Sequence, residues 1–112
     1  MTVPAGAHVH DRLRELKTAL EEMEDLLRQN DAGNWADWIR QVLEGLERRD
    51  ADALENLLGR YRGGMGSFND LVVGEFSWSG GPVPAAVRRA NDRLNELRDR
   101  CYSAATYLRD RL

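Results

Sequence analysis

The sequence predicts an all-α protein with a single-domain, four-helix bundle-like fold, and three observations lead to this expectation. Apolar residues recur every three to four positions over most of the chain, which is the spacing of amphipathic helices. Residues 63–82 interrupt this pattern with six glycines, three aromatic residues and little charge. A chain of 112 residues can bury roughly two thirds of its unfolded surface, which is enough for one core without disulfide or metal support.

The first helix is expected over residues 8–30, because its apolar residues alternate by steps of four and three. This seam consists of Val9, Leu13, Leu16, Leu20, Met23 and Leu27. The segment Asn30-Asp31-Ala32-Gly33 is typical of a helix end followed by a turn.

Two shorter helices are expected over residues 34–49 and 51–62, with Asn34 and Asp50 as their N-caps. Gly59 weakens the second of them by about 1 kcal/mol relative to alanine. The expected inward residues are Trp35, Trp38, Ile39, Val42, Leu43 and Leu46, followed by Leu54, Leu57, Leu58 and Tyr61.

The last helix is expected over residues 84–111, because proline is favoured in a first helical turn. Its seam consists of Val87, Ala90, Leu94, Leu97, Cys101, Ala104 and Leu108. The two long seams could pair within one bundle, or one could pair with a second copy in a homodimer. The bundle is favoured because the two middle helices also need partners for their apolar faces.

The glycine-rich stretch predicts an irregular loop with one short helical turn between the third and last helices. Ser67 and Asp70 have the spacing of a helix start, which predicts a turn over residues 68–73. Phe68, Leu71 and Val72 would then share one face and close the end of the bundle.

The run Gly63-Gly64-Met65-Gly66-Ser67-Phe68-Asn69-Asp70-Leu71 resembles the hallmark stretch of a family of small uncharacterised bacterial proteins. The resemblance implies a bacterial source and no particular activity. It also implies that the stretch is more than a spacer.

An anion site and a catalytic site are two functional interpretations of this stretch. Backbone N–H groups of residues 64–68 could bind a phosphate, but Met65-Gly66 stands where a P-loop requires lysine and a hydroxyl residue. Ser67 has no histidine nearby in sequence, and the spacing of Asp70 and Glu75 is too common to identify a carboxylate pair. His8 and His10 form a weak metal signal, so neither a metal nor a cofactor is predicted.

Protein binding is the third interpretation and the preferred one, because the stretch contains residue types enriched at interfaces. The candidate residues for binding a partner or ligand are Arg60, Arg62, Met65, Ser67, Phe68, Asn69, Asp70, Glu75 and Trp78. The acidic residues within 21–25 either steer a basic partner or form a solvated helix face. Trp35, Trp38 and Cys101 are expected in the core, with the thiol inert.

The predicted function is a small bacterial protein-interaction module without catalytic activity, of the immunity or antitoxin type. The alternative is a small enzyme or ligand-binding protein with a pocket around Arg60, Asn69, Asp70 and Glu75. The net charge of −3 argues against a nucleic-acid partner, and no apolar run is long enough for a membrane helix. A single cysteine suits the cytoplasm.

Overall fold

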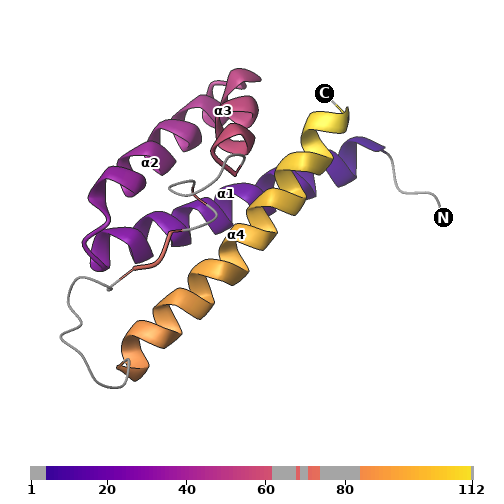
Figure 1. Ribbon diagram of the computed structural model, residues 1–112. Helices are drawn as coiled ribbons and strands as arrows, with labels where there is room; N and C mark the ends of the chain where they lie inside the picture. The colour runs from indigo at the N-terminus through magenta and orange to yellow at the C-terminus, as the bar shows by residue number, and fades with distance from the viewer. Residues whose placement is uncertain (1–4, 62–67, 69–70, 74–83, 112) are drawn as a thin grey trace.

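The structure is a computed structural model that describes residues 5–61, 68, 71–73 and 84–111. Over these residues the chain forms four α-helices and no strand, which confirms the all-α, bundle-like fold (Figure 1). The helices are α1 (Ala5–Gln29), α2 (Gly33–Glu47), α3 (Asp52–Tyr61) and α4 (Ala85–Arg111).

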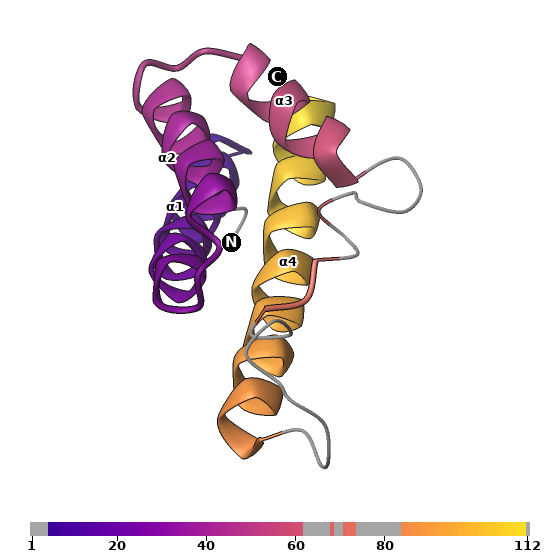
Figure 2. The same ribbon diagram turned by 60° about the vertical axis from the view of Figure 1, so that its left-hand side comes forward.

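The two long helices pack against each other, α2 packs on α1, and α3 contacts both α2 and α4. Figures 1 and 2 show that α1 and α4 cross, so the N-terminal end of α4 projects away from α1. The molecule measures 54 × 30 × 23 Å along its principal axes. The two predicted seams therefore meet within one chain.

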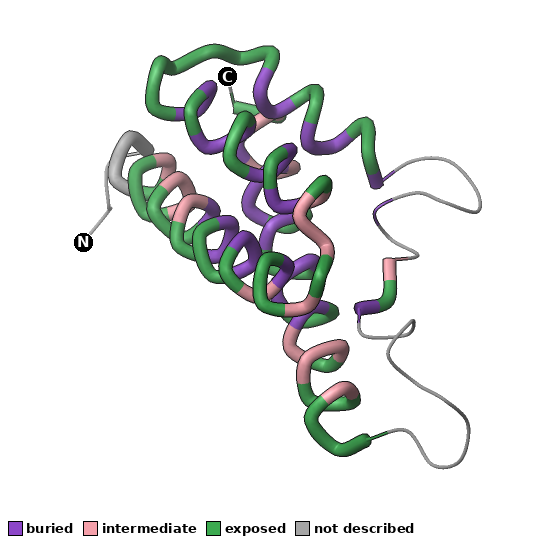
Figure 3. Tube along the Cα trace, turned by 90° about the vertical axis from the view of Figure 1, so that its left-hand side faces the viewer, coloured by how far each residue is buried: buried purple, intermediate pink, exposed green. Residues whose placement is uncertain are grey.

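The core follows the predicted seams in their central parts and loosens toward their ends (Figure 3). Val9, Leu13 and Ala90 are only partly buried and pack against the edge of the core. The fully or almost fully buried seam residues are Leu16, Leu20, Met23 and Leu27 of α1 and Leu94, Leu97, Cys101, Ala104 and Leu108 of α4. The inward residues predicted for α2 and α3 are all buried except Trp35, which is half-buried.

Two helices end at non-glycine residues with a left-handed backbone, Asp31 (φ 60°) and Arg49 (φ 59°). The N–H of Ala32 donates to the carbonyl of Leu27 at 2.9 Å, and the N–H of Asp50 donates to that of Gly45 at 2.9 Å. Both bonds span five residues, as in a Schellman motif, and satisfy carbonyl groups that the helix end leaves open.

The predicted starts of the last three helices, at residues 34, 51 and 84, each differ by one residue from the observed starts at Gly33, Asp52 and Ala85. The Asp50 carboxylate accepts the N–H of Asp52 at 3.0 Å, and Pro84 directly precedes α4. The prediction of Asn34 as the N-cap of α2 is wrong, because α2 begins at Gly33 and its N-cap is Ala32. The Schellman bond brings Ala32 directly from the end of α1 into this position, and no side chain caps the helix there.

The prediction of a helical turn over residues 68–73 is wrong at the described positions beyond Phe68. The N–H of Leu71 donates to the carbonyl of Phe68 at 3.3 Å, which closes one turn, but residues 71–73 are not helical. Side chains of α4 bind the main-chain groups that a continuing helix would pair internally, as described below.

Candidate functional site

Seven of the nine predicted site residues lie outside the described part of the chain. They are Arg62, Met65, Ser67, Asn69, Asp70, Glu75 and Trp78. The structure describes Arg60 and Phe68, together with residues 71–73. We call Phe68 and residues 71–73 the docked segment, because their contacts attach the glycine-rich stretch to the helices.

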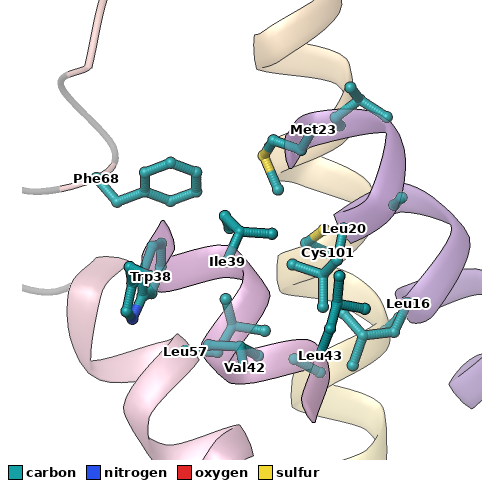
Figure 4. Close-up of a cluster of buried hydrophobic side chains, with 14 of the residues drawn as sticks. Leu16, Leu20, Met23, Trp38, Ile39, Val42, Leu43, Leu57, Phe68 and Cys101 are labelled. Atoms are coloured by element: carbon teal, nitrogen blue, oxygen red, sulfur yellow. The ribbon is translucent and has the colours of Figure 1, made fainter. Parts of the chain in front are cut away.

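Phe68 is fully buried among three aromatic side chains of α2 and α3. Its ring centroid lies 5.2 Å from that of Trp35, 4.9 Å from that of Trp38 and 5.5 Å from that of Tyr61. Figure 4 shows the ring beside Trp38 and Ile39. We call the three aromatic side chains around the Phe68 ring, Trp35, Trp38 and Tyr61, the aromatic pocket. Phe68 thus lies in the core, in agreement with its expected position at the end of the bundle. Its side chain has no exposed surface that a partner could contact.

The remaining side chains of the docked segment alternate between the core and the solvent. Leu71 is half-buried, Val72 is 50% exposed and Val73 is 2% exposed. The neighbouring side chains of Val72 and Val73 thus face opposite sides, one the solvent and one the core. The prediction that Val72 faces the core is therefore wrong, and Val73 takes its place.

Arg98 of α4 binds the main chain of the docked segment. Its Nη1 donates to the carbonyl oxygen of Phe68 at 2.6 Å and to that of Leu71 at 2.9 Å, and its Nη2 donates to Oδ1 of Asn95. The guanidinium carbon lies 5.8 Å from the centroid of the Phe68 ring. Arg98 is only 6% exposed, and charge-assisted hydrogen bonds of this kind offset the cost of burying a cation.

Asn91 binds the other end of the docked segment through its side-chain amide. Its Oδ1 accepts the N–H of Val73 at 2.8 Å, and its Nδ2 donates to the carbonyl of Val73 at 3.1 Å. The same Nδ2 donates to the carbonyl of Val87 at 3.0 Å, so both amide hydrogens are used. The pairing with Val73 reproduces the exchange of bonds between neighbouring antiparallel strands.

Neither Arg98 nor Asn91 is among the site residues that the sequence predicts. A signal for Arg98 does exist, because it lies four residues after Leu94 and three before Cys101 on the buried face of α4. A charged residue at such a position indicates a specific polar partner. The sequence does not indicate which carbonyl groups that partner supplies.

Arg60 lies on the outer side of the aromatic pocket. It is exposed, and its guanidinium carbon lies 5.7 Å from the Trp38 ring centroid. Trp38 also donates from Nε1 to Oδ1 of Asn56 at 3.3 Å. The side chains of Phe68, Trp38 and Arg60 are therefore in contact in that order, from the buried ring to the exposed guanidinium of α3.

Residues 28–79 match the family model of a domain of unknown function (DUF6966). The match covers slightly less than half of the chain and agrees with the expected resemblance to an uncharacterised family. Neither the curated proteins nor the solved structures gave a significant match.

The matched region divides the contacts of the docked segment into two groups. Phe68 and the aromatic residues around it lie inside the match, whereas Asn91 and Arg98 of α4 lie beyond its end. The aromatic pocket is thus built entirely from the part of the chain that is similar to the family.

The acidic residues within 21–25 contribute to helix packing. Glu24 is 6% exposed and accepts hydrogen bonds from Arg40 of α2 at 2.5 Å and from Arg28 at 2.9 Å. The hydrogen bond from Arg40 is the main cause that holds the pKa of Glu24 below its ordinary value. Glu22 pairs with Arg93 of α4, so two acids of this region connect α1 to its neighbours.

Cys101 and the two histidines give no sign of a reactive site. Burial raises the pKa of the Cys101 thiol to about 12, so the thiol stays protonated at neutral pH. His8 and His10 are exposed on α1, and the described residues contain no group of three or more potential metal ligands. None of the described helices is long and apolar enough to cross a membrane.

A surface cavity of about 310 Å³ lies between α1 and α4. Its charged lining residues are of both signs, and no residue of the docked segment lines it. The lining consists of Asp11, Arg14, Glu15, Thr18, Ala19, Glu22, Leu97 and Arg100.

Proposed function

We propose that the protein is a non-catalytic module that binds another protein, and that the partner contacts the surface around the docked segment. The observation that carries this proposal is the position of Val72 and Tyr102. Among the described residues they are the large hydrophobic side chains that are exposed, each at 50%. Both are connected to the docked segment. Val72 belongs to it, and the Tyr102 ring lies 5.3 Å from the Tyr61 ring, which in turn contacts Phe68.

The support beneath these two side chains favours binding. The main chain of the docked segment is held by Asn91 and Arg98, and Phe68 fills the aromatic pocket. A surface that is ordered before binding loses less conformational entropy when the partner arrives. Tyrosine and arginine are also enriched at protein interfaces, and Tyr102 and Arg60 are both exposed.

The chemistry of the described residues supports binding over catalysis. The amide of Asn91 and the guanidinium of Arg98 are occupied by main-chain groups, and the Cys101 thiol is buried and protonated. Within the class of binding proteins, we propose an immunity or antitoxin type in the bacterial cytoplasm. Masking a partner in this way requires a surface rather than a reaction.

Affinity capture from the native cell, read by mass spectrometry, tests the proposal. The wild type is compared with a Val72→Asp, Tyr102→Asp variant and with a Gln29→Asp, Gln41→Asp control, which makes the same charge change at other exposed positions. We expect the wild type and the control to retain a stoichiometric protein and the first variant to lose it at least tenfold.

All three proteins must first show equal melting temperatures, and the captured protein must bind the purified wild type directly. Equal retention by the Val72→Asp, Tyr102→Asp variant would place the binding surface elsewhere. Recovery of every variant without a partner would remove the support for a protein-binding function.

A further inference from the structure

Four residues form a stripe along the outer face of α4. Asp92, Asn95, Asp99 and Tyr102 follow one another at steps of three, four and three residues, which places them on the same side of a helix. All four are exposed. We call these four residues the outer stripe. It presents two carboxylates and no cation to the solvent.

The described part of the chain does not neutralise these two carboxylates. The side chains of Asp92 and Asp99 form no ion pair and no hydrogen bond with another described residue. Other acids close by are paired, since Glu22 and Glu96 both bind Arg93. Carboxylates that are left without a cation on one face attract a positively charged partner.

The ring of Tyr102 is open to a cation, in contrast to that of Tyr107 on the same helix. The guanidinium carbons of Arg111 and Arg12 lie 3.6 Å and 5.2 Å from the centroid of the Tyr107 ring. Tyr102 is 50% exposed, and none of the described arginine or lysine side chains stacks on its ring. The chain therefore covers one of these tyrosines with its own arginines and leaves the other uncovered.

Asp99 and Tyr102 together fit an arginine side chain. They are three residues apart, so they are neighbours on the helix surface. Burial is the main cause that raises the pKa of Tyr61, and the charge of Asp99 adds to this effect, so Asp99 lies on the side of α4 that faces Tyr61. Tyr102 contacts Tyr61 from the same side. A guanidinium can stack on an aromatic ring and donate two hydrogen bonds to a carboxylate, whereas an ammonium group is a point charge.

Val72 adds an apolar side chain beside the outer stripe (Figure 2). Arg98 binds the carbonyl of Leu71 and Asn91 binds the N–H of Val73, so the residue between them is held next to α4. Asn91 and Arg98 directly precede the two aspartates of the stripe in the sequence. An exposed valine therefore lies near the two carboxylates.

We propose that the outer stripe and Val72 form one interaction surface, and that the partner presents a basic segment in which an arginine lies beside an apolar residue. The arginine pairs with Asp99 and stacks on Tyr102, a second cation approaches Asp92, and the apolar residue packs on Val72. This proposal rests on the proposed function for the existence of a partner and adds the chemistry of the segment that is recognised.

Selection from a phage-displayed library of random dodecapeptides tests this inference. The library is first depleted on the Val72→Asp, Tyr102→Asp variant and then selected on the wild type. We expect the enriched peptides to carry a net positive charge and an arginine next to an apolar residue. In fluorescence anisotropy, replacing that arginine with citrulline should weaken binding of the labelled synthetic peptide at least tenfold.

Two protein variants then locate the charges that the peptide recognises. Asp92→Asn, Asp99→Asn should bind the enriched peptide at least tenfold more weakly than the wild type. Glu21→Gln, Asp25→Asn makes the same charge change at exposed positions of α1 and should bind within about twofold of the wild type. Both variants must first show the melting temperature of the wild type.

Several results would overturn the inference. They are the absence of any enriched peptide, the enrichment of peptides without positive charge, and equal weakening by the α1 control, which would reveal only a general attraction to an acidic protein. The native partner found by affinity capture separates this inference from the proposed function. If the Val72→Asp, Tyr102→Asp variant loses that partner while Asp92→Asn, Asp99→Asn retains it in full, the proposed function stands and the basic segment is wrong.

Discussion

The protein buries its main chain in two different ways. One is the contact between α1 and α4, and the other is the attachment of the docked segment. In the helix pair the main chain is satisfied internally, and side chains at three- and four-residue steps fill the space between the axes. In the docked segment residues 71–73 are not helical, and main-chain groups of the segment are bound by Asn91 and Arg98 of another element. The first region depends on an apolar pattern, whereas the second depends on a few individual residues.

This difference determines how each region should respond to substitution. A helix seam distributes its stabilisation over many apolar contacts, so each seam position carries a share of the total. The docked segment concentrates its stabilisation in Phe68, Val73 and the two polar residues of α4. Substitutions in the two regions can therefore test the comparison directly.

Phe68→Ala should have the largest effect, a loss of about 3–5 kcal/mol in the free energy of unfolding, as expected for emptying a buried aromatic site. The ring contacts three aromatic side chains and has no exposed surface. Urea unfolding measures this loss, with Val72→Ala as a control expected to stay within about 0.5 kcal/mol of the wild type. A loss below 1 kcal/mol for Phe68→Ala would show that the segment does not depend on its anchor.

Asn91→Asp should destabilise the protein by about 2–3 kcal/mol at neutral pH, because it removes two donated hydrogen bonds and faces a carboxylate toward two carbonyls. The matched control is Asn95→Asp, one turn along the same helix, where the new carboxylate would accept from Arg98. The control should be neutral or slightly stabilising. Equal losses for both variants in chemical denaturation would contradict the assigned role of the Asn91 amide.

Gly45→Ala and Gly59→Ala test the helical region with the same chemical change in opposite surroundings. A Cβ at Gly45 would lie 2.8 Å from the Cβ of Ala53, so we expect a loss of about 1–2 kcal/mol from overpacking. A Cβ at Gly59 would meet no atom within 4 Å, and this substitution should stabilise α3 by up to about 1 kcal/mol. Thermal unfolding reports both changes, and a stabilised Gly45→Ala protein would show that α2 and α3 can separate at little cost.

Glu24→Gln should cost about 1 kcal/mol at pH 7 by weakening the bonds from Arg40 and Arg28. The pKa of Glu24 is lowered in the folded protein, so its contribution is present above the unfolded pKa of about 4.3 and is lost as the pH falls further. The difference between wild type and variant should accordingly disappear in acid. Glu22→Gln should have a smaller effect, because that pair is more exposed. An unchanged difference between pH 7 and pH 3 would exclude the ionised carboxylate as its source.

The sequence indicated the helices well, because an amphipathic helix needs only local periodicity and a partner surface. The central seam residues, the burial of Trp38 and Tyr61, and the inward position of Phe68 all agree with the structure. The wrong predictions have two causes, a main-chain bond at a helix end and contacts between distant residues. Asn34 is not a cap because the end of α1 places Ala32 there, and residues 71–73 are not helical because α4 takes their main-chain groups.

The sequence by itself determined the class of the fold and the long apolar faces of its helices, and it favoured the pairing of these faces within one chain. Each of these follows from the order of side chains along a regular backbone. Only the tertiary structure decided that Val73 rather than Val72 faces the core, and that Arg98 and Asn91 hold the docked segment. The physical reason is that main-chain hydrogen-bonding groups are the same at every residue, so no sequence pattern records which distant side chain will satisfy them.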